Sequence, residues 1–138
     1  MTIDEILALL RAGFGRWDET GIAIDAAGHR AARLRMEVGA RALRPGGTVS
    51  GPTMFLLADT AIYVAVLASV GPQALAVTTN MSINFLRKPP PGGLVAECRL
   101  LKLGKRLAVG DVTIYSEGDD EPVAQATGTY SIPPPADV

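Results

Sequence analysis

Asp59 is the residue whose surroundings in the sequence most clearly indicate chemistry. It is the only charged residue in the apolar run from Met54 to Val70, and apolar residues lie three and four positions away on both sides. A carboxylate in such a setting is costly to bury unless it has hydrogen-bond partners or faces a pocket, and functional sites tolerate that cost. Asp59 is therefore a candidate general base. The alternative is a structural aspartate that bonds to a neighbouring strand or to a second subunit.

The start of the same run offers a second candidate group. Ser50, Gly51 and Pro52 stand where a helix would begin, and the first N–H groups of a helix have no partner inside it. Together with the helix dipole, such groups can polarise a carbonyl or stabilise an oxyanion. Because Pro52 has no N–H, the available donors are those of Gly51 and Thr53. The same residues are equally typical of an ordinary helix start.

A third set of polar groups alternates along the segment after the run. In a strand, residues two apart share one face. One face then carries Thr78, Asn80, Ser82 and Asn84. These side chains could line a pocket near Asp59, or they could form the solvent face of the strand.

Composition excludes several classes of protein. The 138 residues form one domain's worth of chain, 48% are hydrophobic, and the formal net charge is -1, so no global basic field exists to hold nucleic acid. With one cysteine, Cys98, and one histidine, His29, the chain has no cluster for a structural zinc site and no intrachain disulfide. We expect no metal, no cofactor and a cytoplasmic location. The run from Met54 to Val70 is short for a membrane span, which needs about 20 apolar residues.

Periodicity predicts the elements that position these groups. Thr2 and Glu5 have capping-box spacing at the start of an amphipathic helix over residues 1–14. Two alternating strands meet around Gly28, and the long helix covers residues 51–70 before Gly71-Pro72 ends it. Four alternating runs follow, over residues 75–86, 94–103, 107–116 and 123–132, and a Pro-rich tail covers 133–138. This order predicts a single α+β domain with an antiparallel sheet of five to six strands.

The long helix also predicts its own packing. Small side chains recur at intervals of three and four residues, at Ala58, Ala61, Ala65 and Ala68. Such a stripe lets a sheet approach closely, so we expect a curved sheet to wrap this face of the helix. The opposite side is expected to carry Phe55, Leu56, Ile62, Tyr63 and Val66, with Asp59 among them.

Four runs of residues resemble one known family, the hotdog-fold acyl-CoA thioesterases of the phenylacetate-degradation (PaaI-like) type. They are Gly47-Thr48-Val49-Ser50-Gly51-Pro52, Leu57-Ala58-Asp59-Thr60-Ala61, Ile83-Asn84-Phe85-Leu86-Arg87 and Gly104-Lys105-Arg106-Leu107. The resemblance covers about residues 40 to 132. It implies the hotdog fold, in which a long antiparallel sheet wraps one central helix.

The resemblance also implies roles for individual residues in hydrolysing an acyl-CoA thioester. Asp59 falls on the catalytic carboxylate, as general base or nucleophile, Gly51 on the carbonyl-polarising N–H, and Thr78 on a hydroxyl that places water. Coenzyme A would be part of the substrate, and its phosphates would lie near Arg87, Lys88, Lys105 and Arg106. Other substrate contacts would come from Arg44, Ser50, Pro52, Phe55, Tyr63 and Asn80. Lys and Arg in exposed turns are also common for solubility alone.

Three positions depart from the family pattern. Where relatives carry Asn, and later His-Gly-Gly, this chain has Arg44 and then Ser50-Gly51-Pro52. The loss of the Asn removes a side-chain donor, Pro52 removes a backbone donor, and each such donor can be worth roughly 10²-fold in rate. A non-hydrolytic acyl-CoA-binding protein is therefore the alternative function. A hotdog dehydratase is disfavoured, because His29 is in the wrong region for a catalytic histidine.

The spacing of Gly51 and Asp59 has a consequence for assembly. Eight residues on one helix separate them by about 12 Å along its axis, too far to reach one thioester together. If both act on one substrate, Gly51 of one subunit must meet Asp59 of another across a two-fold axis. We expect at least a homodimer, and the resemblance implies a homotetramer.

Overall fold

The computed structural model describes residues 1–39 and 45–134, and it has the predicted α+β composition. Arg44 and the last four residues of the Pro-rich tail lie outside the described residues. The elements follow in the order α1 (Ile3–Gly13), the 3₁₀ turn η1 (Trp17–Thr20), β1 (Ile22–Gly28), β2 (Ala31–Met36), α2 (Gly51–Val70), β3 (Val77–Phe85), β4 (Leu94–Leu103), β5 (Leu107–Ser116) and β6 (Pro122–Ser131).

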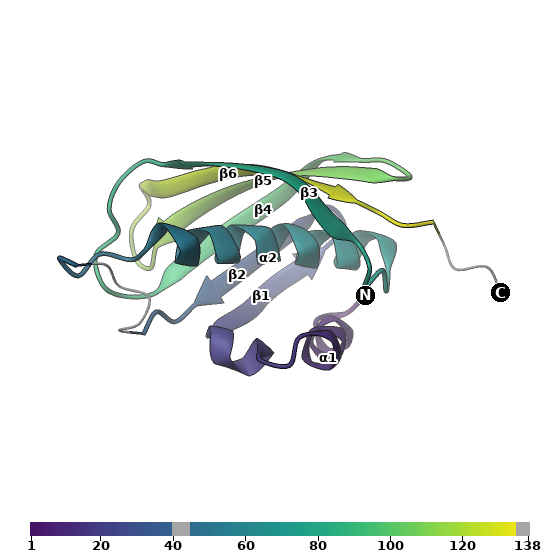
Figure 1. Cartoon of the computed structure of the whole chain (residues 1–138), viewed down its shortest axis with the longest axis horizontal. Coiled ribbons are helices and arrows are strands. Elements are labelled where there is room, and N and C mark those ends of the chain that lie inside the picture. The colour runs from purple at the N-terminus through teal and green to yellow at the C-terminus, as the bar shows by residue number, and fades with distance from the viewer. Residues whose placement is uncertain (40–44, 135–138) are drawn as a thin grey trace.

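The six strands form one antiparallel sheet in the order β1-β2-β4-β5-β6-β3. Figure 1 shows the sheet curving around α2, with α1 on the side of α2 away from β5 and β6. The chain crosses from β2 at one side of the sheet to β3 at the opposite edge by way of α2, and the hairpins β4-β5 and β5-β6 fill the space between them. This is the predicted hotdog fold.

Helix α2 forms the core because its side chains are apolar nearly all round. Ten of its residues are buried, and its length and hydropathy would suit a membrane span. In this structure the surrounding sheet covers those side chains instead, as expected for the central helix of a packed domain. Of the predicted small-residue stripe, Ala58, Ala61 and Ala65 are fully buried and Ala68 is partly buried against the core.

Ile62 corrects one expectation about that packing. It was placed on the side of α2 away from the sheet, but it is fully buried and faces two strand glycines. A Cβ added at Gly110 would lie 2.9 Å from Ile62 Cγ1, and one added at Gly128 would lie 2.7 Å from Ile62 Cδ1. The helix therefore packs closely on the sheet for two reasons. Two strand residues that face it have no side chain, and the helix itself presents alanines.

Helix α1 is held at both ends. The predicted capping box is present, since Glu5 N donates to Thr2 Oγ1 at 3.2 Å and Thr2 N donates to Glu5 Oε1 at 3.0 Å. Ile6 and Leu10 are buried against the core, and α1 packs on both α2 and β1. The first segment of the chain is thus a fixed part of the domain.

A β-bulge in β3 determines which of its residues face α2. Thr78 pairs with Tyr130, whereas Asn80 pairs with Thr129, so the register shifts between them. Paired residues share a face, and β6 buries Tyr130 on the helix side while Thr129 lies on the outer side. The prediction that Thr78 and Asn80 share one face is therefore wrong, because the extra residue at the bulge reverses the alternation.

Candidate active site

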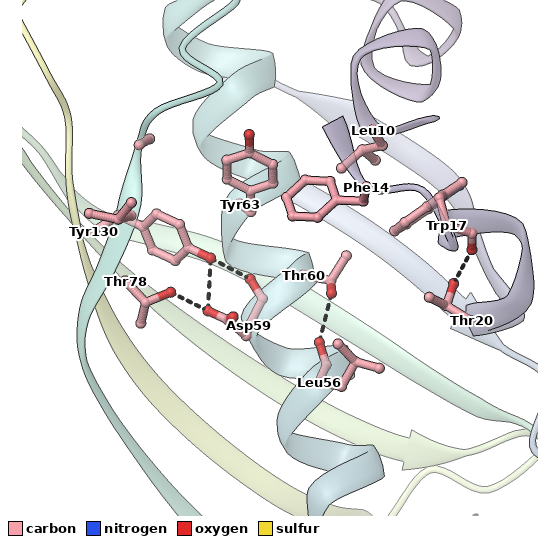
Figure 2. Close-up of a pocket in the computed structure, with 12 residues that line it drawn as sticks. Leu10, Phe14, Trp17, Thr20, Leu56, Asp59, Thr60, Tyr63, Thr78 and Tyr130 are labelled. Carbon is pink, nitrogen blue, oxygen red and sulfur yellow. Dashed lines mark hydrogen bonds between the residues drawn. The ribbon is translucent and has the colours of Figure 1, made fainter. Parts of the chain in front are cut away.

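Asp59 lies in the middle of α2 with its carboxylate held on one side. Thr78 Oγ1 donates to Asp59 Oδ1 at 2.6 Å, and Tyr130 Oη donates to the same oxygen at 2.7 Å (Figure 2). Tyr130 Oη also lies 3.1 Å from the backbone oxygen of Asp59. No hydrogen bond to Oδ2 occurs within residues 1–39 and 45–134. The carboxylate is thus oriented through one oxygen while the second remains available.

Tyr130 is suited to remain a donor. Its side chain is 4% exposed and stacks on Tyr63, with ring centroids 5.9 Å apart. Burial, and then the negative charge of Asp59, raise the pKa of Tyr130 above its ordinary value. The phenol therefore stays protonated across the physiological range and keeps its hydrogen bond to the carboxylate. Burial also raises the pKa of Tyr63, whose hydroxyl donates to Ala74 O at 3.0 Å.

Asp59, Thr78 and Tyr130 form a polar cluster in the wall of a cavity of about 400 Å³. Thr60 also lines this cavity, and its hydroxyl donates to Leu56 O at 2.7 Å. The rest of the lining is mainly apolar and aromatic, and consists of Leu10, Phe14, Trp17, Thr20, Leu56, Tyr63, Ala76 and Val77. Figure 2 shows Phe14 and Trp17 on one side of α2 and Thr78 with Tyr130 on the other. Among the described residues that line this cavity, Asp59 is the only charged side chain.

The start of α2 lines a second, separate cavity of about 550 Å³. Its walls include Ser50, Gly51, Pro52, Phe85, Arg87 and Lys88, and it shares no lining residue with the Asp59 cavity. Ser50 caps the helix, because its Oγ accepts from Thr53 N at 3.3 Å. Of the two donors expected here, Thr53 N–H is thus already engaged, while Gly51 N–H has no acceptor among residues 1–39 and 45–134.

Gly51 is also restricted by its neighbour on β3. A Cβ at this position would lie 3.1 Å from the ring of Phe85. The glycine therefore lets the aromatic ring approach the first turn of α2 closely.

The basic residues lie at two different ends of the fold. Arg87 and Lys88 line the cavity beside Gly51, and Arg87 forms an ion pair with Glu121. Lys105 and Arg106 are exposed in the β4-β5 turn, which lies at the end of the sheet away from the start of α2 (Figure 1). Within one chain the four residues therefore form two basic groups.

The structure places the remaining candidates in different environments. Tyr63 lines the Asp59 cavity, whereas Phe55 is 39% exposed on the surface of α2. Asn80 lies on the outer face of the sheet and does not line the Asp59 cavity. Its proposed contact with substrate has no support from this position within one chain.

Tyr130 and the wall formed by Leu10, Phe14 and Trp17 were not among the site residues predicted from the sequence. Tyr130 lies 71 positions from Asp59 in the sequence, and no local pattern links the two. The sequence did contain one indication of Tyr130. It is a large aromatic residue with a polar group, and it stands at a position of the last strand whose side chain points inward. A buried tyrosine hydroxyl usually requires a partner.

Comparison with known proteins agrees with this fold. A family model described as the thioesterase superfamily matches residues 46–123. A proposed esterase from Saccharolobus solfataricus is 32% identical over 100 residues, which cover 72% of this chain and 65% of that relative. The match therefore spans slightly less than two thirds of the relative's length.

Two solved structures extend the comparison. A proposed thioesterase from Silicibacter sp. TM1040 is 50% identical, with a TM-score of 0.87 and coverage of 97% of this chain and 93% of that one. The E. coli PaaI protein from the phenylacetic acid degradation operon is 28% identical, with a TM-score of 0.77 and coverage of 91% and 93%. The chain belongs to the thioesterase superfamily, and it has the hotdog fold of the PaaI-like type.

Proposed function

We propose that this protein hydrolyses acyl-CoA thioesters to a free acid and coenzyme A. The observation that carries the proposal is the placement of Asp59, whose Oδ1 is fixed by Thr78 and Tyr130 in the wall of a mainly apolar cavity. Family membership supports hydrolysis of a thioester in general. The cavity supplies an apolar surface for an acyl group beside the reactive carboxylate.

Asp59 can act in either of two ways. As a general base, Oδ2 takes a proton from water, whose oxygen attacks the thioester carbonyl, and the C–S bond then breaks to release the CoA thiolate. As a nucleophile, Oδ2 attacks the carbonyl directly, forms a mixed anhydride and expels the same thiolate, and water then hydrolyses the anhydride. In both routes Thr78 and Tyr130 hold Oδ1 and aim Oδ2.

The negative oxygen formed at the carbonyl requires a donor, and Gly51 N–H is the proposed one. The two cavities of one chain are separate, and about 12 Å of helix lies between Gly51 and Asp59. We therefore place Gly51 of the partner subunit opposite Asp59, so that a homodimer holds two composite sites. Arg87 and Lys88 line the same cavity as Gly51, where they would meet the CoA phosphates.

The surface around α2 and β3 is consistent with such a dimer. β3 is an edge strand of the sheet and presents unpaired backbone groups on its free side. Large apolar side chains are exposed on these two elements and just after β3, namely Phe55, Leu56, Val77, Phe85 and Leu86. Apolar groups gathered beside a free strand edge are typical of a protein interface.

Release of free thiol from a panel of acyl-CoA esters tests the function, with Asp59→Asn as the active-site variant. We expect Asp59→Asn to lower kcat/KM at least about 10²-fold, since the amide can neither accept the proton nor attack. Asp111→Asn is the matched control, because Asp111 is a hydrogen-bonded carboxylate on the outer face of the sheet. Full activity in Asp59→Asn would rule out the mechanism.

The alternative, an acyl-CoA-binding protein without turnover, is decided by the same samples. Calorimetric binding of acyl-CoA by the native protein with no thiol release would select it. The specific feature that favours this alternative is Pro52, which removes one backbone donor from the first turn of α2.

A further inference from the structure

The wall of the Asp59 cavity opposite the sheet comes from the first twenty residues of the chain. Leu10 lies near the end of α1, Phe14 is the residue that follows this helix, and Trp17 and Thr20 belong to η1. None of the four lies within residues 46–123, the part that matches the family model. The cavity is therefore completed by a segment outside the matched region.

This segment is a fixed wall, because consecutive hydrogen bonds tie it together. Phe14 N donates to Leu10 O at 2.8 Å, Trp17 N donates to Phe14 O at 3.0 Å, and Thr20 Oγ1 donates to Trp17 O at 2.7 Å. Leu10 and Trp17 are 1% and 6% exposed, so the core holds both. The Phe14 ring packs edge-on against Tyr63, with centroids 6.0 Å apart.

The chemistry of the cavity indicates which part of a substrate it takes. The thioester carbonyl must lie beside Asp59, so one side of the substrate extends toward α1 and the other extends away from it. Among the described residues, the lining on the α1 side consists of Leu10, Phe14, Trp17 and Thr20 and includes no basic group. Arg11 and Arg16 of the same segment are exposed and form ion pairs with Asp18 and Glu19. A CoA diphosphate could not be desolvated there without a charge partner, whereas an apolar acyl group could.

We infer that the α1–η1 segment forms the acyl subsite and sets the acyl length that the enzyme accepts. This inference rests on the proposed thioesterase function. The substrates it selects are CoA esters of small to medium apolar acids, because a cavity of about 400 Å³ is at the low end of the roughly 300–1,000 Å³ range of ligand pockets. Phe14 is the residue assigned to limit length, since it lines the cavity and is 51% exposed, whereas Leu10 and Trp17 are buried in the core.

Trp17 provides a direct readout, because it is the only tryptophan in the chain. The experiment titrates the native protein with non-hydrolysable acyl-CoA thioethers of increasing acyl length and, separately, with free CoA. We expect Trp17 emission to change with the thioethers, more strongly as the acyl group lengthens, and to stay constant with CoA alone. Unchanged emission in a protein that hydrolyses acyl-CoA would overturn the acyl subsite and leave the function standing. Unchanged emission in a protein that neither hydrolyses nor binds acyl-CoA would overturn both the acyl subsite and the proposed function.

Variants of Phe14 test the length limit in both directions. Phe14→Ala is expected to move the acyl length of maximal kcat/KM upward and Phe14→Trp to move it downward, by changes of about tenfold in the ratio of long to short substrates. Leu101→Ala is the control, since Leu101 is similarly exposed, at 52%, on a strand outside the cavity. An unchanged length profile in both Phe14 variants contradicts the inference.

Discussion

The hydroxyl of Tyr130 lies 2.7 Å from Oδ1 of Asp59 and 3.1 Å from the backbone oxygen of the same residue. This contact joins the middle of the central helix to the last strand of the sheet. With Thr78 on β3 donating to the same Oδ1, the carboxylate is fixed from two adjacent strands, and its orientation depends on the pairing of β3 with β6.

Tyr130→Phe tests the contribution of that phenol. A hydrogen bond to a charged group is worth about 1.5–3 kcal/mol, so its loss should lower kcat/KM by about tenfold or more.

Tyr63→Phe is the matched control for this variant. Tyr63 stacks on Tyr130, but its hydroxyl donates to Ala74 O instead of Asp59. Tyr63→Phe should therefore keep most of the native kcat/KM. If both variants lose kcat/KM equally, the effect is one of packing and the assigned role of Tyr130 is wrong.

Thr78→Val removes the second donor to Oδ1 while preserving the shape of the side chain. We expect a loss in kcat/KM of about tenfold, with a smaller change in KM, because the substrate does not need this hydroxyl for binding. Thr78→Ser keeps the hydroxyl and should restore most of the activity. Equal losses in Val and Ser variants would show that the methyl group, rather than the hydrogen bond, matters.

Adding a methyl group at either strand glycine that faces Ile62 should destabilise the fold, and the two glycines meet different atoms of the Ile62 side chain. Gly110→Ala places Cβ against Cγ1 and Cγ2 of Ile62, at 2.9 and 3.0 Å, next to its stiff branch point. Gly128→Ala meets the terminal Cδ1, at 2.7 Å. Overpacking costs about 1–3 kcal/mol, so both variants should lose free energy of unfolding in urea titrations.

A double-mutant cycle with Ile62→Val separates the two sites. Ile62→Val deletes Cδ1, so it should relieve Gly128→Ala and leave Gly110→Ala nearly additive. Gly28→Ala is the control, because a Cβ there meets nothing within 4 Å. Additive behaviour in both cycles would contradict the assigned contacts.

Cys98 should be inert in the folded protein. It is 5% exposed, and burial, together with the charge of Asp111, raises its pKa to about 12. A thiol reagent at pH 8 should therefore label it only after unfolding, which also keeps thiol-release assays free of background. The pKa of this thiol is about 8.5 in the unfolded chain and about 12 in the folded one. Its contribution to the free energy of unfolding is therefore complete below about pH 8.5 and declines as the pH rises above that value. Rapid labelling of native protein would contradict this burial.

The sequence predicted most of the fold because periodicity and turn residues mark it strongly. The bounds expected for β4 and β5 agree with those observed, and α2 ends before Gly71-Pro72 as expected. The faces of two elements were less predictable. A bulge in β3 separates Thr78 from Asn80, and Ile62 turns toward the sheet because glycines on β5 and β6 make room for it. Neither effect leaves a signal in the local sequence.

The candidate site was predictable where one residue was unusual by itself. Asp59 was such a residue, since a lone charge in an apolar helix requires an explanation. Tyr130 and the wall around Trp17 were not, because their role comes from elements far apart in the sequence that meet only in the folded chain. The position of Gly51 relative to Asp59 gave the prediction of composite sites from helix geometry alone.

The central claim, that each site joins Asp59 of one subunit to Gly51 of the other, is tested most directly by mixing two inactive variants. Asp59→Asn removes the carboxylate, and Gly51→Pro removes the backbone donor at a helix position that accepts proline. Gly51→Ala is the control, because it also approaches the Phe85 ring but keeps the N–H. Co-expressed in equal amounts, the two variants should recover about a quarter of native activity, since half of the dimers are mixed and one of their two sites is intact. Activity no higher than that of the separate variants, in folded mixed dimers, would contradict the account.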